Sequence, residues 1–189
     1  MIAGLNDLTG NPKGYHKKIG SQNLSAKAGC ALCHPVALRE LKNGAFHVVD
    51  LENLMGEFHE DWTYVQSSVE AYKRISGWQC GDAAIISGHP KLVTALGDHA
   101  HDFRVKAAKC GVNGADLALM QIMLNEPLVH DCLLIGSGDG AFAPIAENAR
   151  SRGIHVVVLA RPGSLSTALK KAACEVRWLE SPSPLPLAA

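Results

Sequence analysis

Short apolar runs alternate with amphipathic stretches along residues 45–179. Runs rich in Val, Ile, Leu and Ala are typical of buried strands, whereas apolar positions that repeat about every 3.6 residues are typical of helices with one buried face. The expected strands are residues 45–51, 82–88, 104–109, 130–138, 154–160 and 174–179, the last at an edge of the sheet. The expected helices are residues 62–76, 91–100, 115–125, 142–152 and 164–173.

This alternation predicts an α/β fold. A strand, a helix and a second parallel strand form a right-handed crossover, so a series of them builds one sheet with helices on both faces. We therefore expect a three-layer α/β/α sandwich with a central, mainly parallel sheet of about five to six strands. In such sheets the chemistry collects at the carboxyl ends of the strands.

The two ends of the chain differ from this central part. Residues 1–44 are rich in Gly, Asn, Lys and Ser without a sustained period, so we interpret them as a loosely ordered extension. The tail 181–189 carries three prolines, which cannot continue a central strand or a helix. The expected organisation is one domain over residues 45–180, flanked by these two segments.

Composition narrows the class of protein. Hydrophobic residues make up 47% and aromatic residues 5%, so the core has to be built from aliphatic side chains. Equal numbers of basic and acidic residues argue against a protein that coats nucleic acid through an overall positive charge. They leave a local basic groove open as an alternative. The sequence lacks a secretory signal and a membrane-length apolar run, so we expect a cytoplasmic location.

Acidic residues stand where the expected strands end. Asp50 ends the first strand, with Glu52 and Asn53 just beyond it, and Asp139 lies in a glycine-flanked turn after the fourth. Asp116 opens the helix over residues 115–125. Carboxylates gathered at one edge repel each other unless a cation neutralises them. Mg²⁺ or Mn²⁺ suits such a site, because both ions prefer carboxylate and water oxygens.

Each acid taken alone has a structural alternative. An Asp just before a helix often only caps it, and this applies to Asp116 and to Asp139. Asp50 is harder to explain as a cap, because no helix is expected immediately after it. The three acids together favour a metal site.

The glycine-rich turn allows a second interpretation. Gly136, Gly138 and Ala141 fit the G-x-G-x-x-[GA] spacing of dinucleotide-binding turns. Against this, the next strand ends in Arg161 instead of the acid expected to hold a ribose, although an arginine suits a 2′-phosphate. The fingerprint also usually follows the first strand of its domain, and here it follows the fourth. A nucleotide-cofactor enzyme with a Rossmann-like site remains the less favoured alternative.

Three motifs contain these residues: VVDLENL at 48–54, GADLALM at 114–120 and GSGDGAF at 136–142. Together they resemble the "DxxN" strand, the acid-opened helix and the "SGDxDF" turn of the NYN domain family, which is related to the PIN-domain nucleases. The resemblance covers roughly residues 45–180. It implies a PIN-like α/β/α sandwich and metal-dependent cleavage of RNA.

The resemblance also implies roles for individual residues. Asp50, Asp116 and Asp139 fall on metal-coordinating or catalytic acids. Asn53 falls on their polar partner, which orients a metal-bound water or a phosphate, and Ser137 on a serine that caps the helix or touches phosphate. The implied reaction is phosphodiester hydrolysis, which leaves 5′-phosphate and 3′-hydroxyl ends.

One position departs from the family pattern. Where the family commonly has a second aspartate in "SGDxDF", this chain has Ala141. The loss of a carboxylate weakens metal affinity or shifts the preferred ion, so an RNA-binding or regulatory module without turnover stays an alternative. Glu52 is a candidate to compensate, whereas Glu147 lies almost two helical turns beyond Asp139 and is expected to point elsewhere.

RNA is the expected partner, gripped locally by nearby cations, and a homodimer is one option for the oligomeric state. The candidate basic residues are Lys106, Lys109, Arg150, Arg152, Arg161, Lys170 and Lys171.

The motif C-x-x-C-H, formed by Cys30, Cys33 and His34, is not explained by the resemblance. We interpret the cysteines as two ordinary thiols. Zn²⁺ held with His16 or His34 is the alternative, although a regular second pair of ligands is missing. Covalent haem is disfavoured without an export signal. Other histidines near strand ends are interpreted as structural: His47, His89, His130 and His155.

Overall fold

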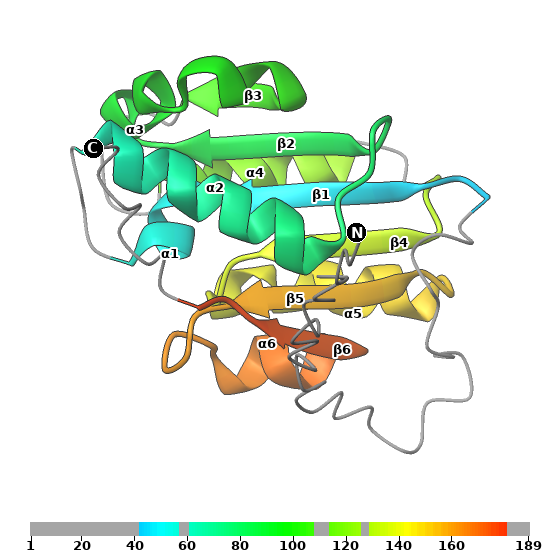
Figure 1. The fold of residues 1–189 in the computed structure, drawn as a ribbon. Coiled ribbons are helices and arrows are strands. Elements are labelled where there is room, and N and C mark those ends of the chain that lie inside the picture. Colours follow the sequence, from blue (N-terminus) through cyan, green and yellow to red (C-terminus); the bar gives the residue numbers. More distant parts are fainter. Residues whose placement is uncertain (1–41, 57–60, 108–113, 126–128, 181–189) are drawn as a thin grey trace, which may run out of the picture.

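A parallel sheet of six strands lies between two layers of helices (Figure 1). The computed structural model describes residues 42–56, 61–107, 114–125 and 129–180. The strands are β1 (Ala45–Asp50), β2 (Ala83–Gly88), β3 (Arg104–Ala107), β4 (Cys132–Gly136), β5 (His155–Ala160) and β6 (Glu175–Trp178). Their spatial order is β3-β2-β1-β4-β5-β6, and every neighbouring pair is parallel. The expected α/β sandwich is confirmed, with β6 at an edge.

The helices cover the two faces of the sheet in chain order. One face carries α1 (Leu51–Met55), α2 (Trp62–Ser76) and α3 (Pro90–Ala95), and the other carries α4 (Gly114–Asn125), α5 (Ala143–Ser151) and α6 (Thr167–Ala172). Side chains alternate between the faces along each strand. In β5, Val156 and Val158 pack toward α4–α6, whereas Val157 and Leu159 pack toward α1–α3. Two aliphatic cores result, one on each side of the sheet.

Local signals explain where α2 begins and ends. The Asp61 carboxylate accepts a hydrogen bond from the Thr63 backbone N–H at 2.9 Å. Gly77 ends the helix in the left-handed region at φ 77°, where glycine is favoured. Both positions agree with the sequence prediction. The expected helix over 91–100 is instead divided into α3 and a 3₁₀ segment, Gly97–Asp102.

A helix that the sequence pattern does not reveal starts directly after β1. The Asp50 side chain caps α1 by accepting hydrogen bonds from the backbone N–H groups of Glu52 at 3.1 Å and Asn53 at 3.2 Å. Gly56 ends this helix at φ 89°. The expectation that no helix follows Asp50 is therefore wrong. Five residues are too few for a helical period to be recognised.

The strand order reverses direction between β1 and β4. The chain runs outward from β1 through β2 to β3, and it returns to place β4 on the other side of β1. Connections therefore leave β1 and β4 in opposite directions, which is the arrangement that opens ligand sites in parallel sheets. Separately, none of the helices in the described ranges is long and apolar enough to cross a membrane.

Candidate functional site

Two buried acids meet at the carboxyl edge of the sheet. Asp50 ends β1 and is 4% exposed, and Asp116 lies in the first turn of α4 and is 8% exposed. Their carboxyl groups lie close enough to interact electrostatically. Burial, followed by the charge of Asp116, raises the pKa of Asp50 to about 8. The fold therefore disfavours two negative charges at this place.

Asp116 has bonding capacity that the described residues leave unused. Its Oδ1 atom is buried and has no hydrogen-bond partner among the described residues. Asp116 is also not the residue before the helix, because α4 begins at Gly114. The capping interpretation of Asp116 is therefore wrong. A buried, unsatisfied carboxylate oxygen is costly unless a ligand uses it, and its chemistry fits a hard divalent cation.

Asp139 lies near this pair but bonds within its own turn. Its carboxylate accepts a hydrogen bond from the Ala141 backbone N–H at 2.8 Å and caps the short 3₁₀ segment Gly140–Phe142. Burial is the main cause that raises the pKa of Asp116, and the charge of Asp139 adds to it. Across 42–56, 61–107, 114–125 and 129–180, no group of three or more His, Cys, Asp or Glu side chains is assembled to hold a metal ion. The site is thus a pair of acids with a third within electrostatic range.

The other two predicted residues connect the turn after β4 to Asp50 and α1 by hydrogen bonds. Ser137 Oγ donates to Asp50 Oδ2 at 3.3 Å and accepts from the Asp139 N–H at 3.1 Å. Asn53 Oδ1 accepts from the Gly138 N–H at 2.8 Å.

The glycines of this turn are explained by packing against the protein. A Cβ at Gly136 would lie 2.8 Å from the Tyr72 ring, and one at Gly138 would overlap the Ser164 carbonyl oxygen. Moreover, the Asp50 carboxylate occupies the amino end of α1, in the first turn of the domain, where a dinucleotide would place its pyrophosphate. These contacts do not favour the nucleotide-cofactor interpretation.

The acids considered as substitutes for the missing aspartate differ in position. Ala141 is exposed on the 3₁₀ segment, and Glu147 is exposed on α5. Glu52 is also exposed, but its charge contributes to the raised pKa of Asp50. Glu52 is therefore close enough to influence the pair electrostatically.

Ser87 joins the site although the sequence analysis did not identify it. It is the direct neighbour of Asp50 in the β1–β2 register. Ser87 is completely buried, and its Oγ has no hydrogen-bond partner among the described residues. The available signal was a polar residue near the end of an otherwise apolar strand.

One of the basic candidates reaches α1 beside the site. Arg161, just after β5, donates from Nε to the Asn53 carbonyl oxygen at 3.1 Å. Its guanidinium lies over Gly56, where any Cβ would overlap it. Arg150 instead donates to the Lys171 carbonyl oxygen at 3.1 Å, on the α5–α6 side.

The other candidates do not enter this description of the site. Cys30, Cys33 and His34 lie outside the described residues, as do Lys109 and the side chain of Lys106.

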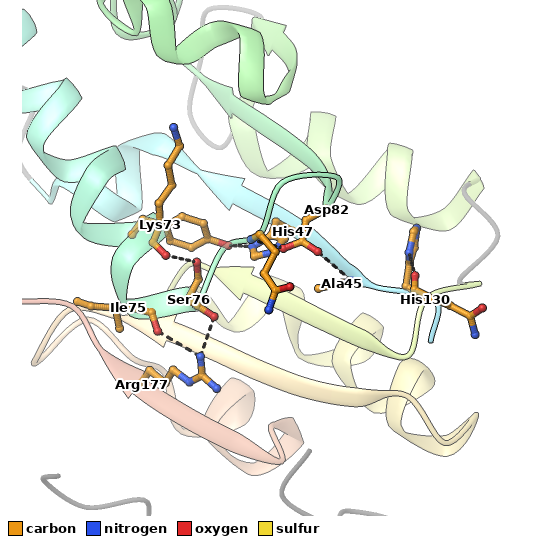
Figure 2. Close-up of polar contacts among 11 residues, drawn as sticks. Ala45, His47, Lys73, Ile75, Ser76, Asp82, His130 and Arg177 are labelled. Atoms are coloured by element: carbon orange, nitrogen blue, oxygen red, sulfur yellow. Dashed lines mark hydrogen bonds and ion pairs between the residues drawn. The ribbon is translucent and has the colours of Figure 1, made fainter. Parts of the chain in front are cut away.

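His47 belongs to a separate polar network on the α2 side of the sheet. Its Nδ1 hydrogen bonds with the Tyr72 hydroxyl at 2.9 Å, and its Nε2 with Asp82 Oδ2 at 3.2 Å. Nearer the sheet edge, Arg177 Nη1 donates to the carbonyl oxygens of Ile75 at 3.1 Å and Ser76 at 2.7 Å, as Figure 2 shows. These contacts support a structural role for His47.

Comparisons with known proteins agree with this architecture. The family model described as the NYN domain matches residues 37–180. A crystal structure of a protein of unknown function from Vibrio parahaemolyticus RIMD 2210633 is similar, with a TM-score of 0.52 and 17% sequence identity. The similarity covers 72% of this chain and 93% of that one, and at this identity it bears on the fold alone. A search among curated proteins found no match.

Proposed function

The chain belongs to the NYN domain family, a group of PIN-like nuclease-family domains, and from that premise we propose that it is a metal-dependent ribonuclease. A divalent ion, Mg²⁺ or Mn²⁺, would be held by Asp50, Asp116 and Asp139. The observation that carries this proposal is the buried pair of Asp50 and Asp116, with Asp116 Oδ1 left without a partner.

The pair is easier to explain as a cation site than as a structural device. Two neighbouring buried acids do not form an opposite-charge pair, and their raised pKa values mean that the fold disfavours their ionised forms. A cation removes the repulsion and supplies a partner for the free oxygen. The location supports this explanation, because parallel sheets place ligands at their carboxyl edge.

The chain's own side chains position the reacting groups. The ion would make a water a stronger nucleophile at neutral pH and offset the charge that develops on the scissile phosphate. Asp50 is held in one orientation by the α1 backbone N–H groups and by Ser137. The side-chain NH2 group of Asn53 is suited to donate to a phosphate oxygen, and Arg161 to bind the RNA backbone nearby. Hydrolysis by water needs no protein nucleophile.

An RNA-binding module with weak or no turnover is the second candidate. It is favoured by Ala141, which stands where the family commonly has another aspartate, and by the Asp139 carboxylate that bonds within its own turn. Such a protein would bind RNA through the same edge without cutting it.

The test is cleavage of labelled single-stranded and structured RNAs with Mn²⁺, Mg²⁺ or EDTA. We expect metal-dependent cutting by the natural chain and its loss in Asp50→Asn and in Asp139→Asn. Glu147→Gln is the matched control, because this acid is exposed on α5. RNA binding without cleavage above the level of the two Asn variants would support the binding module instead.

A further inference from the structure

We propose that the Ser87 hydroxyl is a further oxygen of the cation site, contacting the hydrated ion between β2 and α4. This inference rests on the proposed function, since it assumes that the acids hold a divalent ion. It adds a residue that lies outside the three motifs shared with the family.

The strand register places Ser87 beside the acids. Asp50 and Ser87 are direct partners on the neighbouring strands β1 and β2. Two residues earlier on these strands, Val48 and Ile85 belong to the core that includes Leu119 of α4. Because side chains alternate along a strand, Asp50 and Ser87 face the same side as these residues. Asp116 lies in the first turn of α4, on that same side.

Ser87 lacks a structural reason to be polar in its own surroundings. A buried serine usually donates to a nearby carbonyl oxygen, as Ser68 does to Tyr64 at 2.8 Å and Ser76 does to Lys73 at 3.0 Å. Ser87 is equally buried, yet its Oγ has no partner among the residues that the structure describes. Burying a hydroxyl in this state costs stability, so an alanine would be the better residue for packing alone.

The second unsatisfied atom indicates what the hydroxyl serves. Asp116 Oδ1 and Ser87 Oγ are both buried and unpartnered, and they lie on two elements that pack together. A hydrated divalent cation offers an electrophilic centre to the carboxylate and water hydrogens to a neutral hydroxyl. One ligand of this class therefore accounts for both atoms.

The experiment measures Mn²⁺ binding to the full chain by isothermal titration calorimetry, without RNA. The variants are Ser87→Ala and the matched control Ser68→Ala, which removes another buried serine far from the acids. We expect Ser87→Ala to weaken Mn²⁺ affinity about tenfold or more, as is typical when a residue supporting a metal site is removed. Ser68→Ala should retain the natural affinity. Urea unfolding in EDTA is recorded for each protein.

The outcomes separate this inference from the proposed function. If the natural chain fails to bind Mn²⁺, both are overturned. If the natural chain and Ser87→Ala bind Mn²⁺ equally well, only the role of Ser87 is overturned. In EDTA, Ser87→Ala should be as stable as the natural chain or more so, because it loses no hydrogen bond. Lower stability in EDTA would indicate a structural hydroxyl and would also overturn the inference.

Discussion

The sheet carries buried polar residues on both faces, and the two groups differ in whether their polar atoms have hydrogen-bond partners. On the α2 side, His47 is bonded through both ring nitrogens, to Tyr72 and to Asp82. At the carboxyl edge, the pKa values of both Asp50 and Asp116 are raised, and one oxygen of Asp116 has no partner within the described residues. We call the first group the α2-side network and the second the carboxyl-edge pair.

The difference shows in the direction of the pKa shifts. Burial tends to raise the pKa of Asp82, but hydrogen bonds from His47 and from the Gln79 backbone N–H outweigh it and lower that pKa. Burial raises the pKa of Asp50, and the nearby Asp116 increases the shift. The fold thus stabilises a charge in the network and disfavours one in the pair. A buried charge that the fold disfavours is expected where a ligand completes the site.

The largest expected effect is the contrast between two Asp→Asn substitutions, one of which should reduce RNA cleavage and the other the free energy of unfolding. Asp116→Asn should reduce metal-dependent RNA cleavage at least about 100-fold, because a carboxylate that holds the ion is lost. Asp82→Asn should leave cleavage per folded molecule unchanged and lower the free energy of unfolding by about 1–2 kcal/mol, because one charged acceptor is lost. Cleavage rates and urea unfolding measured on both variants test this contrast. Equal loss of cleavage in both would remove the distinction between the two regions.

The next largest effect is expected for Arg177, which lies on the α2 side of the sheet. Arg177 Nε donates to Glu175 at 2.7 Å, in addition to its bonds to the last carbonyl oxygens of α2. We expect Arg177→Met to lower the free energy of unfolding by about 2 kcal/mol, less than for a fully buried ion pair because the side chain is 22% exposed. Arg74→Met, at an exposed position of the same helix, should change it by less than about 0.5 kcal/mol.

The two regions should also differ in their dependence on pH. The folded pKa of Asp50 is about 8 and its ordinary value is 3.8, so the native state holds a proton that the unfolded chain releases between these values. Without metal, this carboxyl group therefore makes the protein less stable as pH rises through that window. One pKa unit corresponds to about 1.4 kcal/mol, and we expect at least that loss between about pH 5 and about pH 8.

Asp82 has the opposite sign, because its folded pKa is lowered. Its contribution to stability is present above its ordinary pKa and is lost as pH falls through the folded one.

The role of Asp50 is tested by urea unfolding of Asp50→Asn in EDTA. The free energy of unfolding of this variant should decline less between about pH 5 and about pH 8 than that of the natural chain. An unchanged decline would mean that Asp50 is not its source.

The smallest effect is expected for a single hydroxyl of the network. Tyr72 is fully buried, and Tyr72→Phe leaves His47 Nδ1 without its partner. The expected loss in the free energy of unfolding is about 1 kcal/mol, with cleavage per folded molecule unchanged. Thermal unfolding and the RNA assay on the same sample check both statements. A loss of cleavage without a loss of stability would contradict the structural role of the network.

Much of the fold follows from the alternation of apolar runs and amphipathic segments, since the four central strands are buried almost along their whole length. Predictions from periodicity fail where an element is short or interrupted. Five residues of α1 are too few to show a period, and Gly97, in the left-handed region at φ 55°, separates α3 from the 3₁₀ segment. Capping residues could be predicted where a helix was already expected, as at Asp61.

The site was predictable only in part, because strand order is not written along the chain. The motifs identify Asp50, Asp116 and Asp139, and the structure brings the first two close enough to interact electrostatically. Ser87 becomes a neighbour of Asp50 only once β2 is known to lie beside β1. The raised pKa values of the two acids likewise depend on burial and distance, which spacing in the sequence does not supply.

The most direct test of the central claim is urea unfolding of the natural chain and Asp116→Asn, each in EDTA and in Mn²⁺. In EDTA, Asp116→Asn should be the more stable protein, because it removes a buried carboxyl group whose ionised form the fold disfavours. In Mn²⁺, the natural chain should gain stability by binding the ion and become the more stable of the two. If Mn²⁺ leaves the order unchanged and stabilises neither protein, the carboxyl-edge pair is not a cation site.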